Sequence, residues 1–201
     1  MRGNLVLYKK KIFSYALNIF VTSLSLLLTL VPLGSEAKVT EKNAYDFGFV
    51  SIDGVPMELA KYKNKVLLVV NTASQCGFTG QYSELQALWN KYKNRGLVVI
   101  GVPSADFGNQ EFNSNKKVKE FCSVNFNINF PMTHISKVVG DNAHPFFQWA
   151  TDNVGVIGTP RWNFHKFLID SKGRIADWFS STTSPSSEKI IKAIEVQLSK
   201  I

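Results

Sequence analysis

Two aliphatic runs dominate the hydrophobic pattern beyond residue 40, and each predicts a strand buried on both faces. They read VLLVVN, from Val66 to Asn71, and LVVIGV, from Leu97 to Val102, and both are too short for a helix. Between them, apolar residues recur at the helical spacings of three and four: Leu85, Leu88, Trp89 and Tyr92. Gly96 supplies a stop for that helix. This order predicts a βαβ unit with two parallel strands.

The flanking segments complete the predicted architecture. Residues 44–59 predict a β-hairpin, because two alternating stretches flank Asp53-Gly54, a dipeptide suited to a tight turn. In chain order we then expect a helix over 115–125, an edge strand near 130–135, a helix starting near Ala143, a hairpin over 164–179 and a capped helix over 186–199. The predicted class is α/β with a thioredoxin-like fold: a central mixed β-sheet flanked by helices, with an N-terminal β-hairpin. A fold by itself carries no function.

Residues 1–37 differ from the rest of the chain. Basic residues precede an uncharged apolar run from Ile12 to Gly34, and Ser35-Glu36-Ala37 resembles a peptidase site. The segment predicts a signal peptide, although its apolar run is long enough to span a bilayer as an anchor. We therefore expect one domain over residues 38–201, exported to the periplasm or medium, or tethered outside the cytoplasm.

Charge and cysteine content narrow the function classes. The chain carries +8, of which residues 1–37 hold +3, from four basic side chains and one acidic side chain, which leaves +5 for residues 38–201. The remaining lysines are scattered, which favours a solvated surface over nucleic-acid recognition. With only two cysteines in the sequence, a four-cysteine zinc or iron–sulfur site is excluded. Any thiol chemistry belongs to Cys76 and Cys122.

Cys76 lies in a polar, glycine-containing segment between the first buried strand and the following helix. This is the carboxyl end of a strand, where α/β sheets bind ligands, and the nearby helix start offers unpaired N–H groups. Such a setting favours a reactive thiolate. The plainer alternative is a small buried hydrophobic residue.

Two further polar segments are predicted near this point. DFGNQEF, residues 106–112, follows the second buried strand, so its Gln110 could point an amide at the cysteine. PRWNF, residues 160–164, supplies Trp162 and Asn163, whose N–H groups can stabilise a thiolate. Without further context, these three residues could also be a surface glutamine, a core tryptophan and a turn asparagine.

These segments together resemble the glutathione peroxidase family. NTASQCGFTGQYSEL, DFGNQE, FPMTHISKVVGDNAHPFF and PRWNFHKFLID occur in the family's order and approximate spacing. The resemblance implies a peroxidatic cysteine assisted by a glutamine, a tryptophan and an asparagine, at Cys76, Gln110, Trp162 and Asn163. It implies no cofactor, and as partners a hydroperoxide substrate and a reducing thiol co-substrate.

Cys122 occupies the position at which thioredoxin-dependent members carry a resolving cysteine. The resemblance therefore implies a thiol peroxidase that forms a Cys76 sulfenic acid, resolved by Cys122 and recycled by a thioredoxin-like protein. Three alternatives stay open: a glutathione-dependent peroxidase with a structural Cys122, a redox sensor that passes oxidation to a partner protein, and a catalytically silent binding module.

The chain departs from the family at Asp106, where many members have glutamine. A carboxylate near the site would oppose thiolate formation, so we expect it to face solvent. Only TDNVGVIGT, residues 151–159, separates a helix from Trp162, and this short connection predicts a monomer with an open site. The spacings of His134, His144 and His165 match no zinc motif, so we expect no metal.

Overall fold

A computed structural model describes residues 41–201, and the predicted signal or anchor segment lies outside these residues. Its main sheet has the order β4-β3-β5-β6. β3 (Val66–Thr72) and β4 (Leu97–Pro103) pair in parallel, with Thr72 opposite Pro103, so their carboxyl ends meet at one edge. β5 (Lys166–Ile169) and β6 (Ile175–Phe179) add antiparallel strands. The predicted mixed sheet and the parallel βαβ unit are confirmed.

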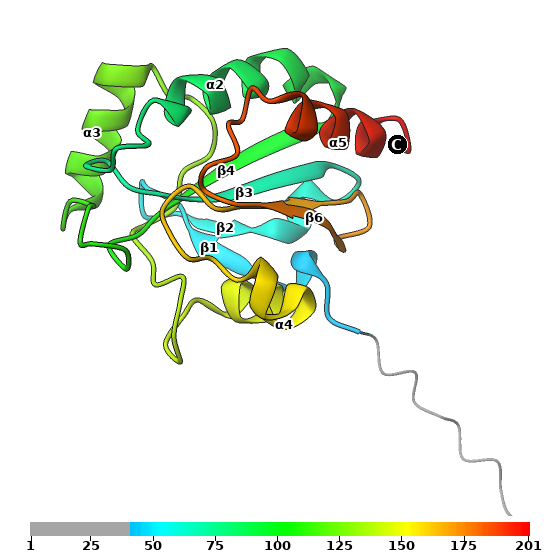
Figure 1. Cartoon of the computed structure of the whole chain (residues 1–201), viewed down its shortest axis with the longest axis horizontal. Coiled ribbons are helices and arrows are strands. Elements are labelled where there is room, and N and C mark those ends of the chain that lie inside the picture. Colours follow the sequence, from blue (N-terminus) through cyan, green and yellow to red (C-terminus); the bar gives the residue numbers. More distant parts are fainter. Residues whose placement is uncertain (1–40) are drawn as a thin grey trace, which may run out of the picture. The chain divides into compact units, whose positions relative to one another are not determined.

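Helices cover both faces of this sheet (Figure 1). One face packs against α2 (Gln81–Tyr92) and α5 (Glu188–Leu198), and the other packs against α4 (Pro145–Gly158). Successive β3 residues point to opposite sides, so Leu68 belongs to the first core and Leu67 to the second. Burial on both faces explains why β3 and β4 read as continuous apolar runs.

The termini of the predicted βαβ helix follow the sequence closely. Short 3-10 turn η3 (Lys93–Arg95) extends α2, and Gly96 ends the helix with a φ of 106°. That left-handed conformation suits glycine, which has no Cβ to clash. Gly96 therefore predicted the end of this helix correctly.

The N-terminal hairpin is confirmed and consists of β1 (Gly48–Val50) and β2 (Pro56–Glu58). It is flanked by 3-10 turns η1 (Ala44–Asp46) and η2 (Leu59–Tyr62). Gly54 adopts a φ of 83° in its turn, as the Asp-Gly pair predicts.

The predicted edge strand near 130–135 forms only two isolated bridges, Ser51 with Thr133 and Gly101 with Met132. The segment lies beside β4, since Gly101 N donates to Pro131 O and Thr133 N donates to Gly101 O. Pro131 has no N–H of its own, so a longer ladder cannot form.

Two helices lie between β4 and β5. α3 (Asn115–Phe126) matches its predicted range, whereas α4 runs to Gly158 and so includes most of the segment predicted as a short connection. Gly155, with φ 66° and ψ −172°, interrupts the helical backbone there. The prediction of a short connection is therefore wrong, because the helix continues across Gly155. The length of this segment no longer supports a monomer.

The C-terminal half otherwise follows its predicted order. Gly173 turns the β5-β6 hairpin with a φ of 83°, and Ser187 caps α5 by accepting from Ile190 N. Within residues 41–201, no helix combines the length and apolarity needed to cross a bilayer.

Candidate active site

Cys76 lies in consecutive turns that connect the end of β3 to the start of α2. Thr79 N donates to Cys76 O at 3.1 Å, and Tyr82 N donates to Thr79 O at 3.0 Å. These local bonds form the turns that lead from Cys76 into the first turn of α2. The Cys76 side chain is 5% exposed and joins the apolar core.

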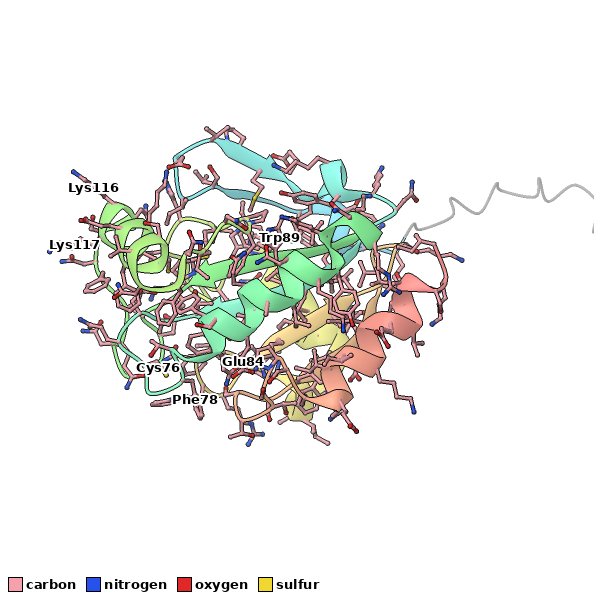
Figure 2. All side chains as sticks on the ribbon, turned by 90° about the horizontal axis from the view of Figure 1, so that it is seen from above. Cys76, Phe78, Glu84, Trp89, Lys116 and Lys117 are labelled. Carbon is pink, nitrogen blue, oxygen red and sulfur yellow. The ribbon has the colours of Figure 1, made fainter. Side chains whose placement is uncertain are left out.

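The Cys76 sulfur accepts a backbone hydrogen bond. Phe78 N donates to Sγ at 3.4 Å, and Figure 2 shows the two residues together at one end of the molecule. In the same view Lys116 and Lys117 project from α3 into solvent, away from the sulfur. A neutral N–H aimed at the sulfur stabilises its charged form without a neighbouring cation.

Gln110 and Asn163 meet through their side chains. Asn163 Nδ2 donates to Gln110 Oε1 at 3.0 Å and is 3.3 Å from Phe107 O. Gln75 N donates to Gln110 O at 2.8 Å, which ties the cysteine loop to the same segment. The carbonyl oxygen of the Gln110 amide accepts the bond from Asn163. The NH₂ group is therefore the end of the Gln110 amide that stays available as a donor. The structure thus brings together two predicted site residues from distant parts of the chain.

Trp162 borders the same cluster and is 39% exposed. Its ring centroid lies 6.1 Å from that of Phe107. A Cβ placed on Gly108 would lie 3.4 Å from Gln110 Cγ and 3.5 Å from Trp162 Cη2, so Gly108 separates the two side chains. Within residues 41–201, neither Gln110, Trp162 nor Asn163 donates directly to Cys76 Sγ, and the Gln110 amide does not reach it as the sequence suggested.

Asn71, near the end of β3, holds the Trp162 segment and was missed at the sequence level. Its Nδ2 donates to Trp162 O at 3.2 Å, and its Oδ1 accepts from His165 N at 2.9 Å. Phe164 N also donates to Asn71 O, and Phe164 adopts a φ of 64°. A fully buried asparagine ending an aliphatic strand was the available signal.

The Asp106 carboxylate does not face solvent as expected. It is half-buried, and its Oδ2 accepts from Val138 N at 2.6 Å and Val139 N at 3.2 Å. The two backbone donors compensate the charge and fasten Asp106 to the 138–139 loop. The Asp106 carboxylate is therefore bound by backbone N–H groups of the 138–139 loop.

Cys122 lies on the inner face of α3 and is 2% exposed. Both cysteines are free thiols and belong to the same apolar core. Burial raises the pKa of Cys122 to about 12, despite a lowering contribution from the Tyr82 hydroxyl beside it. A thiol in this position is protonated at neutral pH and is a poor nucleophile.

The histidines are separate from the cysteine site. His144 Nδ1 accepts from Phe146 N at the start of α4, and its ring stacks on Phe49. His165 is buried against Trp178, and burial lowers its pKa to about 4. No group of three His, Cys, Asp or Glu side chains in the described part of the chain could hold a metal ion.

A thioredoxin-like sheet that carries a buried cysteine at a strand end, beside an amide pair and an indole, defines a class of thiol-dependent oxidoreductase. The family model described as glutathione peroxidase matches residues 44–151. The chain therefore belongs to the glutathione peroxidase family, and it is a peroxidase that uses a thiol co-substrate and no prosthetic group. Trp162 and Asn163 lie beyond the matched range.

Curated relatives match over most of their length. The chain is 41% identical to a glutathione peroxidase of Lactococcus lactis, over 76% of this chain and 99% of the relative. It is 42% identical to a glutathione peroxidase-like peroxiredoxin of Schizosaccharomyces pombe, over 70% and 90% respectively. A hydroperoxy fatty acid reductase of Synechocystis sp. is 40% identical, over 70% and 88%.

Solved structures agree with this assignment. The crystal structure of T. cruzi GPX1 is similar with a TM-score of 0.63 and 31% identity, over 79% of this chain and 97% of the other. A thiol:disulfide interchange protein of Chlorobium tepidum has a TM-score of 0.59 at 19% identity, over 81% and 99%. The second likeness shows the shared thioredoxin-like fold alone.

Proposed function

We propose that the chain reduces hydrogen peroxide and organic or lipid hydroperoxides through Cys76, which Cys122 then resolves. The observation that carries this proposal is the Asn163–Gln110 hydrogen bond, because it assembles two amide side chains next to the loop of a buried cysteine. A cysteine that only packs in the core would not need hydrogen-bond donors gathered at the end of the strand that precedes it.

In the first step the Cys76 thiolate attacks one oxygen of the hydroperoxide. A sulfur–oxygen bond forms, the O–O bond breaks, and the leaving oxygen takes up the proton that the thiol had released, so water or an alcohol departs. Cys76 is oxidised to a sulfenic acid while the peroxide is reduced. The Phe78 N–H is the donor at the sulfur, while Gln110 and Trp162 supply neutral donors beside the cysteine loop that orient the peroxide, and Asn163 fixes the Gln110 amide.

In the second step the Cys122 sulfur attacks the sulfenic sulfur. A disulfide forms, the sulfur–oxygen bond breaks, and the hydroxide leaves as water with the Cys122 proton. Because Cys122 is buried in the core on α3, that helix must loosen before the two Cα atoms reach disulfide range, about 4.4 to 6.8 Å. A dithiol such as a thioredoxin-like protein then restores both thiols.

A glutathione-dependent cycle is the second candidate. The burial of Cys122 favours it, since a core thiol can be purely structural and glutathione could then attack the sulfenic acid from solvent. A redox sensor that transfers oxidation to a partner protein uses the same first step but turns over slowly.

The exposed Trp162 edge supports an accessible site that admits bulky hydroperoxides. The relative named hydroperoxy fatty acid reductase points to the same substrate class. Residues 1–37 support an exported or membrane-tethered enzyme, which would meet lipid hydroperoxides.

Steady-state hydrogen peroxide consumption tests the proposal, with thioredoxin or glutathione as the reductant. Cys76→Ser should abolish turnover with both. Cys122→Ser should abolish turnover with thioredoxin, whereas Val118→Ala, which loosens the same face of α3 but keeps the thiol, should retain it.

Equal glutathione-supported turnover in wild type and Cys122→Ser would make Cys122 structural and favour the second candidate. Fast single oxidation without sustained turnover with either reductant would favour the sensor.

A further inference from the structure

A cleft of about 470 Å³ lies between α3 and the N-terminal hairpin. Lys119 and Cys122 line this cleft from α3, and Asp53 and Met57 line it from the hairpin. The proposed resolving cysteine therefore borders a cleft between two elements that the peroxide step does not use.

One ion pair joins the hairpin to α3 across this cleft. The Lys119 ammonium donates to Asp53 Oδ1, although 66 positions separate the two residues. Within residues 41–201 no other hydrogen bond or ion pair connects the hairpin to α3. The side chains of Lys119 and Asp53 are 54% and 57% exposed, so salt in the solvent can screen their attraction.

The remaining contacts hold α3 to other parts of the fold. The rings of Phe121 and Phe126 pack 5.6 Å apart, and the Phe126 ring lies 5.3 Å from that of Tyr82 in α2. At the start of the helix, Asn115 Oδ1 accepts from Ile135 N at 2.8 Å. The helix is therefore held by packing and by a backbone contact, and its link to the hairpin is electrostatic.

The position of Cys122 couples it to this link. Cys122 follows Lys119 by three residues, about one helical turn, so a displacement of Cys122 displaces Lys119 as well. In the view of Figure 2 the hairpin lies on one side of α3 and Cys76 lies on the other. Movement of Cys122 toward Cys76 therefore draws Lys119 away from Asp53, and the attraction between their charges opposes that movement.

We propose that Asp53 and Lys119 form a clasp that retains Cys122 on the hairpin side and thereby slows the resolving step. Both are positioning residues, because they act through Cys122 and not on the peroxide. The inference rests on the proposed two-cysteine cycle. While the clasp is closed, the Cys76 sulfenic acid persists, and the opening of the ion pair lets α3 deliver Cys122 to it.

Rapid mixing of the reduced full chain with excess hydrogen peroxide separates the two steps. Dimedone trapping reports the Cys76 sulfenic acid, and quenched samples analysed by mass spectrometry report the disulfide. Lys119→Met keeps a long side chain that suits a helix, and Asp53→Asn keeps a residue that suits the turn before Gly54. In each variant we expect an unchanged first step and disulfide formation about two- to fivefold faster.

Two further measurements distinguish the ion pair from a general loosening of α3. The double variant Asp53→Asn/Lys119→Met should be no faster than either single variant, because each substitution alone already breaks the pair. Raising the salt concentration from about 0.01 M to about 1 M should speed disulfide formation in the wild type by a similar factor. The same change should leave Lys119→Met unaffected.

Lys117→Met is the matched control. It removes the same charge from the same helix, but the Lys117 side chain projects into solvent (Figure 2). Both steps should proceed in this variant at the wild-type rate. Faster disulfide formation in Lys119→Met alone therefore cannot come from the net charge of α3.

An unchanged or slower rate of disulfide formation in both Lys119→Met and Asp53→Asn would overturn the inference. Equal acceleration in Lys117→Met would overturn it as well, because the effect would then belong to the charge of the helix. If the wild type forms the sulfenic acid but never the disulfide, the two-cysteine cycle itself fails, which is distinguishable from either of these results.

Discussion

Asn163 and Gln110 join through a 3.0 Å side-chain hydrogen bond, although 53 positions separate them in the chain. Asn163 follows the α4 connection, and Gln110 follows β4, so the bond links two segments at the carboxyl edge of the sheet. It fixes which end of the Gln110 amide carries a free donor. The donor geometry of the proposed peroxide site therefore depends on this pair.

Asn163→Leu should slow the reaction of Cys76 with peroxide by about ten- to a hundredfold, because Gln110 loses the partner that orients it. The second-order rate constant from rapid mixing measures the effect. Asn153→Leu controls for the loss of an amide elsewhere, since the Asn153 side chain on α4 donates to Trp149 O, within its own helix. A wild-type rate in Asn163→Leu would contradict the assigned role.

Gly108→Ala should reduce peroxide reactivity while the fold persists. Gly108 has a φ of 67°, and the added methyl would lie in van der Waals contact with both Gln110 and Trp162, which limits how far either side chain can shift. Gly140→Ala is the matched control, since Gly140 has a φ of 79° and open space around it. Both variants should lose about 1 kcal/mol of stability from backbone strain, but only Gly108→Ala should slow the reaction. Equal rates in the two variants would argue against a close fit at this point.

His165 should make folding stability pH-dependent. Its pKa is about 4 in the folded chain, because of burial and then the nearby Lys166, against an ordinary value of about 6.5. The unfolded chain therefore binds more protons between these values, so stability falls as the pH drops from about 6.5 to about 4. Urea unfolding of His165→Phe should show a pH dependence smaller by about 3 kcal/mol over that window. An identical slope would exclude this contribution.

Lys166 should be a major stabilising residue of the loop before α5. Its buried Nζ donates to Phe164 O and Thr183 O at 2.7 Å each, and to Ser180 O at 3.4 Å. Lys166→Met leaves these carbonyls without their donor, so the free energy of unfolding should fall by about 3 kcal/mol. Urea denaturation measures the change. A variant as stable as wild type would show that packing alone positions the loop.

Much of the fold follows directly from sequence patterns. The β3 and β4 runs, the α2 periodicity and the Gly96 stop each agree with the neighbouring signals, so local and tertiary preferences coincide. The segment near Pro131 and the end of α4 were harder to predict. Pro131 lacks the N–H that a longer ladder would need, and α4 continues across Gly155 although the φ of that residue, 66°, is not helical.

The sequence identified the residues of the candidate site but not the contacts between them. Cys76, Gln110, Trp162 and Asn163 stand out from motifs, yet the motifs do not reveal that Asn163 bonds Gln110 rather than the sulfur. Contacts between distant segments depend on side-chain orientation, which sequence spacing does not fix. Buried polar residues such as Asn71 and Glu111 could be recognised only once their burial was known.

Peptide mass spectrometry after treatment of the reduced full chain with one equivalent of hydrogen peroxide tests the two-cysteine cycle. We expect a disulfide between the Cys76 and Cys122 peptides, with the loss of two hydrogen atoms. In Cys122→Ser we expect a dimedone-trapped sulfenic acid on Cys76. Oxidation confined to Cys122, or an unmodified Cys76 in both proteins, would rule out this cycle.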